Sequence, residues 1–116
     1  MKTMLFMVHT APHGSAAIPE SHRACLGFAT MPFEVNYVLV GDAVWALQTG
    51  QQANAIGGVD ARGLIAELAD LGVNVFAETD ALDARDLPRE HLEAVVPVSA
   101  SEIADMIAGA DAVMTY

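Results

Sequence analysis

Apolar residues along this chain gather in five short runs, and the longer segments between them have apolar positions at helical spacing. The runs are Met4 to Val8, Val35 to Val40, Val73 to Ala77, Val95 to Val98 and Ala112 to Tyr116. Their apolarity is nearly continuous, which is typical of strands covered on both faces. Strands that alternate with helices predict parallel pairing and right-handed crossovers. We therefore expect one α/β domain over residues 1–116, a three-layer sandwich of about five mainly parallel strands that is flavodoxin-like or closely related.

Two predicted helices have clear signals at their ends. From Ser99 to Ala110, Ser99 and Glu102 form a capping-box pattern ahead of apolar residues at helical spacing. Asp60 is placed to cap a second helix, and Gly72 follows its last apolar residue, where a left-handed residue commonly ends a helix. Each helix is predicted to turn one apolar stripe toward the sheet.

Prolines bound a third predicted helix, from Glu20 to Met31. Pro19 pre-sets its first turn, and Pro32 prevents its continuation. A shorter helix is predicted to begin near Asp42, with Asp42 as its N-cap. It leads into a polar, glycine-bearing loop from Thr49 to Gly58.

The chain carries 15 acidic residues against 5 basic ones, a formal net charge of -10. This balance argues against binding to nucleic acid or to an anionic membrane, because that mode needs clustered Lys and Arg. No uncharged apolar run approaches the roughly 18 residues of a membrane helix. The hydrophobic content of 53% is therefore assigned to the interior and to contacts between subunits, and we expect a homo-oligomer.

Cysteine and histidine usage limits the chemistry. Cys25 is the only cysteine, so no disulfide framework forms within the chain and a reducing compartment is favoured. The first apolar run is shorter than the roughly 7 to 15 residues of a signal-peptide core, so we expect a cytoplasmic protein. No helical histidine pair with a nearby acid occurs among His9, His13, His22 and His91. Neither a metal nor another cofactor is predicted.

A loop bent by proline and glycine follows the first predicted strand and belongs to a set of three motifs. The motifs are Ala11 to Ser15 after that strand, Val40 to Val44 with Gly50 to Gln52, and Gly109 to Tyr116 at the end. Together they resemble the DsrE/DsrF/DsrH-like family of small sulfur-metabolism proteins, especially its single-subunit members. The resemblance extends over nearly the whole chain.

The resemblance implies a compact α/β subunit that assembles into trimers or hexamers. It also implies a role in cytoplasmic sulfur trafficking, with a sulfur-carrier protein as the kind of partner. Several family members place a reactive cysteine just after the third strand, whereas the matching stretch here, Val75 to Leu82, holds no cysteine and has Glu78. The resemblance therefore implies a binding or scaffolding subunit that lacks the sulfurtransferase cysteine, and enzymatic activity stays open but disfavoured.

A second function is left open by the residues. Cys25 can serve a divergent sulfurtransferase or persulfide carrier, with His13 or Arg23 assisting, because a thiolate near a positive charge is the nucleophile of such chemistry. Its position beside Phe28 on an apolar stripe also fits a small buried hydrophobic residue.

A third function is a small-molecule binding module at the carboxyl edge of the sheet, where open α/β proteins bind their ligands. The candidate ligand-binding residues are Pro12, His13, Gly14, Ser15, Asp42 and Glu78, with Ser99 at the same edge. His13 is the candidate acid or base, because histidine exchanges protons near neutral pH. Asp42 and Ser99 are also explained as helix N-caps, and no catalytic residue is assigned.

Overall fold

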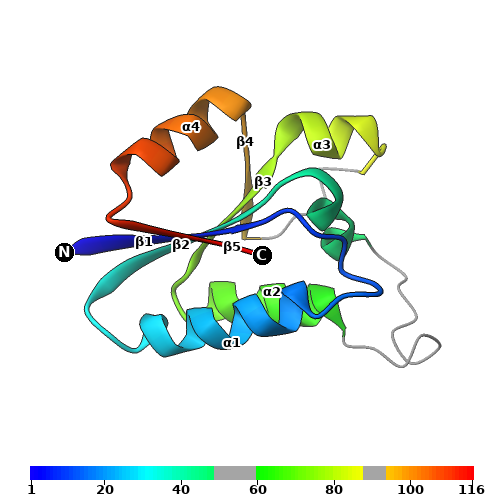
Figure 1. The fold of residues 1–116 in the computed structure, drawn as a ribbon. Helices are drawn as coiled ribbons and strands as arrows, with labels where there is room; N and C mark the ends of the chain where they lie inside the picture. The colour runs from blue at the N-terminus through cyan, green and yellow to red at the C-terminus, as the bar shows by residue number, and fades with distance from the viewer. Residues whose placement is uncertain (49–59, 88–93) are drawn as a thin grey trace.

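Figure 1 shows three layers, a five-stranded sheet with helices on both of its faces. This computed structural model describes residues 1–48, 60–87 and 94–116. The strands are β1 Lys2–Val8, β2 Phe33–Leu39, β3 Asn74–Glu78, β4 Val95–Val98 and β5 Ala112–Thr115. The helices are α1 Ala17–Ala29, the 3-10 helix η1 Gly41–Leu47, α2 Ala61–Asp70, α3 Thr79–Ala84 and α4 Ala100–Gly109. All the strand pairs of the described residues are parallel, which confirms the expected fold class.

The order of the strands across the sheet is β4-β3-β2-β1-β5. In Figure 1, α1 and α2 lie below the sheet, whereas α3 and α4 lie above it. The chain returns through α4 to the far edge, which places β5 beside β1. β2 is followed by η1 and then by α2, below the sheet, whereas β3 is followed by α3, above it. The chain therefore leaves these two neighbouring strands toward opposite faces. In open α/β sheets, the carboxyl ends of two such strands are where sites form.

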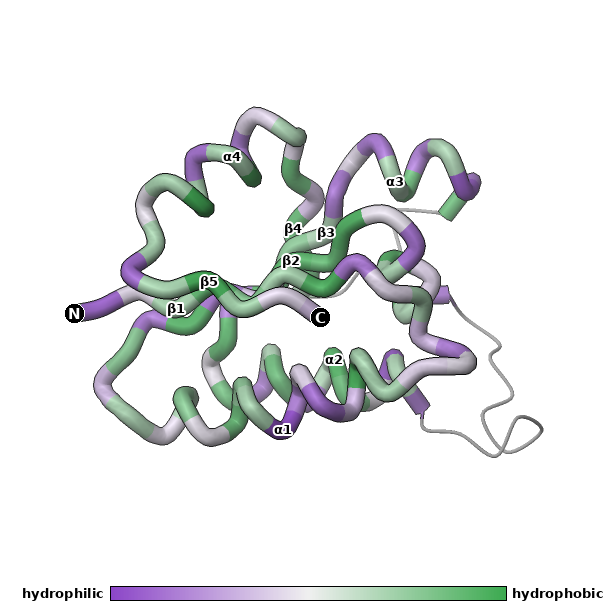
Figure 2. Tube along the Cα trace, viewed as in Figure 1, coloured by the Kyte–Doolittle hydropathy of each residue, from purple (hydrophilic) through white to green (hydrophobic). Residues whose placement is uncertain are grey.

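The two faces of the sheet are covered unequally. The larger core lies against α1 and α2 and includes Phe6, Tyr37, Leu39, Ile65 and Leu68. The core on the α4 side is smaller, with four buried residues, Leu5, Val38, Val98 and Ile103. Figure 2 shows the hydrophobic residues concentrated along the strands and on the sides of the helices that face them. On the α4 side, Val96, Ile107 and Val113 remain 53%, 41% and 39% exposed.

The predicted signals at the helix ends are confirmed for α4 and α2. The Ser99 hydroxyl accepts the Glu102 N–H at 3.1 Å, and the Glu102 carboxylate accepts the Ser99 N–H at 3.0 Å. Asp60 accepts the N–H of Gly63 at 3.1 Å. Gly72 adopts a φ of 91°, the left-handed conformation expected after a helix.

The short helix expected near Asp42 is present as η1, whereas α1 and α3 differ from expectation. α1 begins at Ala17, three residues before Glu20, and Pro19 is its third residue. The first turn tolerates proline at this position because the first N–H groups of a helix have no partner within it. α3 was not expected, since its six residues are too few to show a helical period. The loop expected from Thr49 to Gly58 lies outside the described residues. In the described segments, no helix is long and apolar enough to cross a membrane.

Candidate functional site

A side-chain hydrogen bond connects the carboxyl ends of β2 and β3. Glu78 ends β3, is half-buried, and accepts the Gly41 N–H through Oε1 at 3.0 Å. Gly41 has a φ of 53°, in the left-handed region that glycine adopts at least cost, and it turns the chain from β2 into η1. The Glu78 carboxylate therefore supplies the partner that a partly buried backbone donor needs.

An ion pair lies next to this hydrogen bond. Arg85 donates from Nη2 to Asp42 Oδ1 at 2.7 Å and from Nη1 to the Ala81 carbonyl at 3.0 Å. The guanidinium thus links the end of α3 to the start of η1. The expected N-cap role of Asp42 is wrong: η1 follows Val40 and has no side-chain cap, because the Asp42 carboxylate pairs with Arg85 instead.

The loop between β1 and α1 is shaped by one glycine and one serine. Gly14 has a φ of 82°, which an L side chain adopts only with strain. The Ser15 hydroxyl donates to the Ala11 carbonyl at 2.8 Å and accepts the Ala17 N–H at 3.3 Å. Pro12 is half-buried. The loop is therefore a defined turn rather than an extended connection.

The structure brings the predicted ligand-binding residues together only in part. Asp42 and Glu78 belong to one cluster, through Gly41 and Arg85. In the part of the chain that the structure describes, no hydrogen bond or ion pair joins residues 12–15 to either acid. Ser99 is used by the capping box of α4. The tip of the first loop, at His13, Gly14 and Ser15, is exposed. Asp42 and Ser99 are exposed as well, but the Asp42 carboxylate already pairs with Arg85 and the Ser99 hydroxyl with the α4 backbone.

Cys25 lies in the larger core, between α1 and the sheet. It is 0% exposed, and burial raises the pKa of its thiol from the ordinary 9.0 to about 12. The same core holds a hydrogen bond of 2.7 Å between the hydroxyls of Ser21 and Tyr37, and burial raises the pKa of Tyr37 as well. Arg23 is exposed on α1. Access and ionisation both disfavour attack by the Cys25 thiolate.

Several polar contacts were missed by sequence reasoning. Gly41 has a usable signal, since a glycine that directly follows a predicted strand indicates a left-handed turn. Arg85 has none, because its partner lies 43 residues earlier. His22 is buried on α1, and its Nε2 lies 3.4 Å from Glu67 Oε1 on α2. This contact also joins segments that no local pattern relates.

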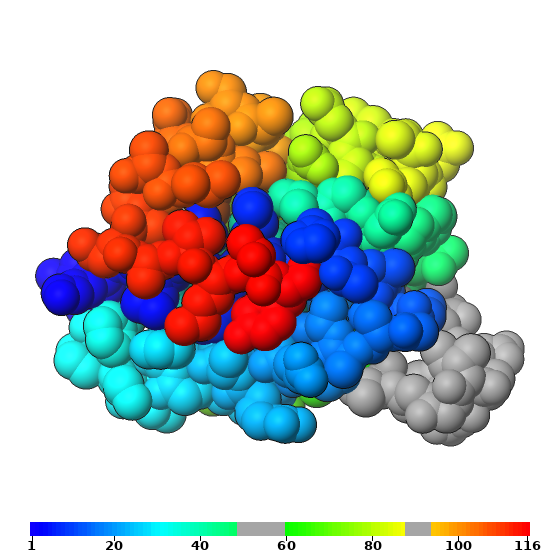
Figure 3. Space-filling model, viewed as in Figure 1, coloured from blue at the N-terminus to red at the C-terminus, as the bar shows by residue number. Residues whose placement is uncertain are grey.

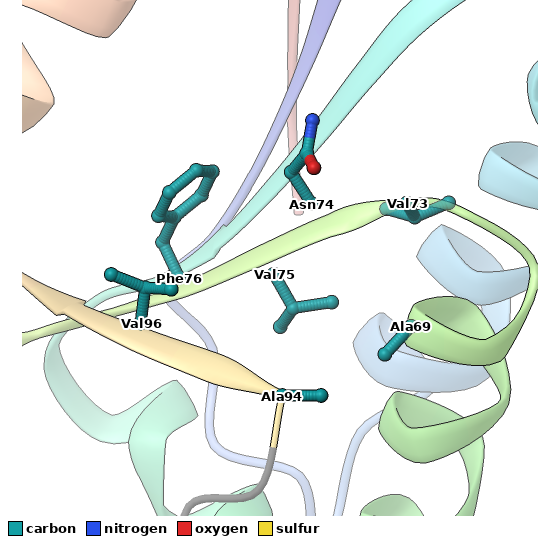
Figure 4. A pocket seen from close by; sticks show the side chains of 7 residues that line it. All are labelled: Ala69, Val73, Asn74, Val75, Phe76, Ala94 and Val96. Atoms are coloured by element: carbon teal, nitrogen blue, oxygen red, sulfur yellow. The ribbon is translucent and has the colours of Figure 1, made fainter.

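Figure 4 shows a shallow cavity of about 170 Å³ at the amino ends of β3 and β4, the opposite edge from the cluster above. Its lining residues are Ala69, Val73, Asn74, Val75, Phe76, Ala94 and Val96. Asn74 is the one polar residue among them, and its Nδ2 donates to Asn36 Oδ1 at 3.0 Å. This lining offers neither a nucleophile nor a base. Among the described residues, no group of three or more His, Cys, Asp or Glu side chains is arranged to hold a metal ion.

The parallel sheet and its carboxyl-edge cluster define a small open α/β subunit with its candidate site beyond β2 and β3. A family model described as the DsrE/DsrF-like family matches residues 2–116, so the chain belongs to that family. Membership supports a small subunit related to sulfur metabolism.

Two solved structures share this fold over their full length. The YchN protein from E. coli is 24% identical with a TM-score of 0.86, and 100% of each chain is covered. MTH1491 from Methanobacterium thermoautotrophicum, described as a protein of unknown function, is 16% identical with a TM-score of 0.74, again with 100% of each chain covered. At these identities the likeness shows the fold alone. A comparison with curated proteins gave no match.

Proposed function

We propose that this protein is a cytoplasmic, homo-oligomeric binding subunit of sulfur trafficking that carries no sulfur on its own thiol. The supporting observation is the burial of Cys25, the one cysteine of the chain, which is 0% exposed with its pKa raised to about 12. A persulfide carrier needs an accessible thiolate. A single cysteine without a disulfide partner also fits the reducing cytoplasm.

The exit of the third strand supports binding rather than transfer. Glu78 stands there and accepts the Gly41 N–H, so its carboxylate stabilises a turn. Asp42 is likewise engaged by Arg85. The exposed tip of the first loop, with His13, is then the surface proposed to bind a small ligand or a sulfur-carrier protein. Such a subunit presents or positions its partner and does not react with it.

The homo-oligomer is supported by the thinly covered face of the sheet. Val96 and Ile107 are 53% and 41% exposed on the α4 side, where the buried core is small. Apolar area of this kind is commonly covered by another subunit. Light scattering on the purified protein at micromolar concentration is expected to give a multiple of the monomer mass. A strict monomer contradicts this part of the proposal.

The sulfur-carrying step has a direct test. The native protein is incubated with a low-molecular-weight persulfide and examined by intact mass spectrometry, beside Cys25→Ala as the baseline. We expect no sulfur adduct on the native protein and a clear adduct on wild-type chain unfolded in urea, since unfolding exposes the thiol. A near-stoichiometric adduct in the native state contradicts the proposal and supports a divergent sulfurtransferase or carrier that uses Cys25.

A further inference from the structure

Among the described residues, β5 forms one edge of the sheet and pairs with β1 on one side only. Figure 3 shows the last residues of the chain, in red, uncovered at the front of the molecule. Natural edge strands often carry a charged residue, such as lysine, or a proline, which discourages pairing with a further strand. The sequence of β5, Ala-Val-Met-Thr, contains none of these. β5 is short, with four residues, but it lacks the side chains that block pairing, so its outer edge is open to another strand.

The backbone groups of β5 point alternately toward β1 and toward the open edge. Tyr116 donates its N–H to a β1 carbonyl at 3.0 Å, and its own carbonyl accepts the N–H of His9 at 2.9 Å. Direction alternates from residue to residue in such a ladder, so Met114 also directs its N–H and C=O toward β1. The N–H and C=O groups of Val113 and Thr115 then face the open edge. An incoming strand has four backbone groups to pair with.

We propose that β5 pairs antiparallel with β5 of a second copy of this chain, which joins two sheets edge to edge across a two-fold axis. In this register, Val113 of each strand lies opposite Thr115 of the other, and each such pair exchanges two backbone hydrogen bonds. Met114 of the two copies meets at the axis. All four outward groups gain partners, and the same surface is used on both copies, as two-fold symmetry requires.

The distribution of charge favours the antiparallel orientation of two copies over the parallel one. Each chain has a net charge of -10, which opposes association of two copies in general, and this repulsion is smallest where the contacting surface is uncharged, as β5 is. The nearest acid is Asp111, whose Oδ2 accepts the Thr3 N–H at 2.7 Å. In the antiparallel register, the two Asp111 residues stand about six residues or 20 Å apart along the strands, well beyond a Debye length of about 8 Å. A parallel pairing places them side by side.

This inference specifies one contact of the proposed homo-oligomer and does not depend on the role in sulfur trafficking. It is tested on the full chain by amide hydrogen exchange, resolved residue by residue with NMR, together with sedimentation at several protein concentrations. We expect the Val113 and Thr115 amides to exchange at least about tenfold more slowly at high concentration than at low. The Met114 amide, which faces β1, is expected to be protected at every concentration.

A pair of proline variants provides the second arm of the test. Val113→Pro removes an outward donor from β5 and is expected to abolish the concentration-dependent association. Ala100→Pro, at the first position of α4 where proline is tolerated, is the matched control and is expected to associate normally.

The possible outcomes distinguish the pairing of β5 with β5 of a second copy, called here the β5 joint, from the proposed homo-oligomer as a whole. An oligomer whose Val113 and Thr115 amides exchange at the same rate at all concentrations overturns the β5 joint but leaves the homo-oligomer standing. A protein that is monomeric at every concentration overturns both. Protection of these amides in wild-type protein, with normal protection of Met114, supports the joint even if Val113→Pro fails to fold.

Discussion

Replacing Glu78 by alanine is expected to destabilise the turn from β2 into η1. The Glu78 carboxylate accepts the Gly41 N–H at 3.0 Å in a partly buried position. A hydrogen bond to a charged group contributes about 1.5–3 kcal/mol, and a buried donor left without a partner costs about 1–3 kcal/mol. Water reaches a partly buried donor to some extent. The expected loss in the free energy of unfolding is therefore about 2 kcal/mol.

This loss converts into a measurable change in Tm. The entropy of unfolding near 60 °C is about 2.1 cal/mol/K per residue, or roughly 0.24 kcal/mol/K for 116 residues. A loss of about 2 kcal/mol then lowers Tm by about 8 °C in a calorimetric or circular-dichroism melt. Glu78→Gln keeps an oxygen acceptor at the same place, without the charge, and is expected to lose about half as much.

Glu34→Ala is the matched control for this experiment, because Glu34 is an exposed glutamate on the neighbouring strand β2. Its change is expected to stay within about 0.5 kcal/mol, as for most surface substitutions. Equal melting temperatures for Glu78→Ala and Glu34→Ala would refute the reasoning. So would a Glu78→Gln variant that melts no higher than Glu78→Ala.

Two further predictions concern the buried thiol and a helix cap. The pKa of Cys25 is about 12 in the folded protein against an ordinary 9.0, so the folded state holds the thiol proton more tightly above pH 9. The free energy of unfolding therefore falls as pH rises from 9, by up to about 1.4 kcal/mol per pH unit. Urea titrations at several pH values should find this fall in the wild type and not in Cys25→Ala. The same pH dependence in both proteins contradicts the prediction. Ser99→Ala removes the capping box and is expected to lower the free energy of unfolding in urea by about 1 kcal/mol. Ser101→Ala, in the same helical turn, is the control and is expected to be nearly neutral. Equal losses in the two variants contradict the capping assignment.

The strands could be predicted from sequence because a parallel strand covered on both faces needs a nearly continuous apolar run. The prediction for Val95–Val98 agrees with β4 at both ends. β1 begins earlier than its apolar run, at Lys2, because an exposed residue can extend a ladder without contributing to the core. The order of the strands was not predictable. β5 lies beside β1 because α4 crosses the sheet, and no local pattern encodes the edge to which a helix returns.

In the candidate site too, contacts between residues close in sequence could be predicted, whereas contacts between distant residues could not. Ser99 and Glu102 lie three residues apart, so their capping box can be read from the sequence. Glu78 was placed correctly at a strand exit, but its partner lies 37 residues earlier. Asp42 satisfied the local rule for an N-cap and was nevertheless assigned wrongly. A partner 43 residues away binds its carboxylate, and a local rule does not include such competition.

The residue at position 78 cannot both stabilise the turn after β2 and serve as the thiol of a sulfur carrier. A cysteine in its place would supply a nucleophile, but a thiol is shorter than a glutamate side chain and a weak hydrogen-bond acceptor. The Gly41 N–H, held at 3.0 Å from the Glu78 carboxylate, would then lose its partner within the chain. A carrier would need another acceptor for that donor or a different turn after β2. With glutamate at position 78, this chain has the geometry of the stabilised turn, which supports the binding role proposed above.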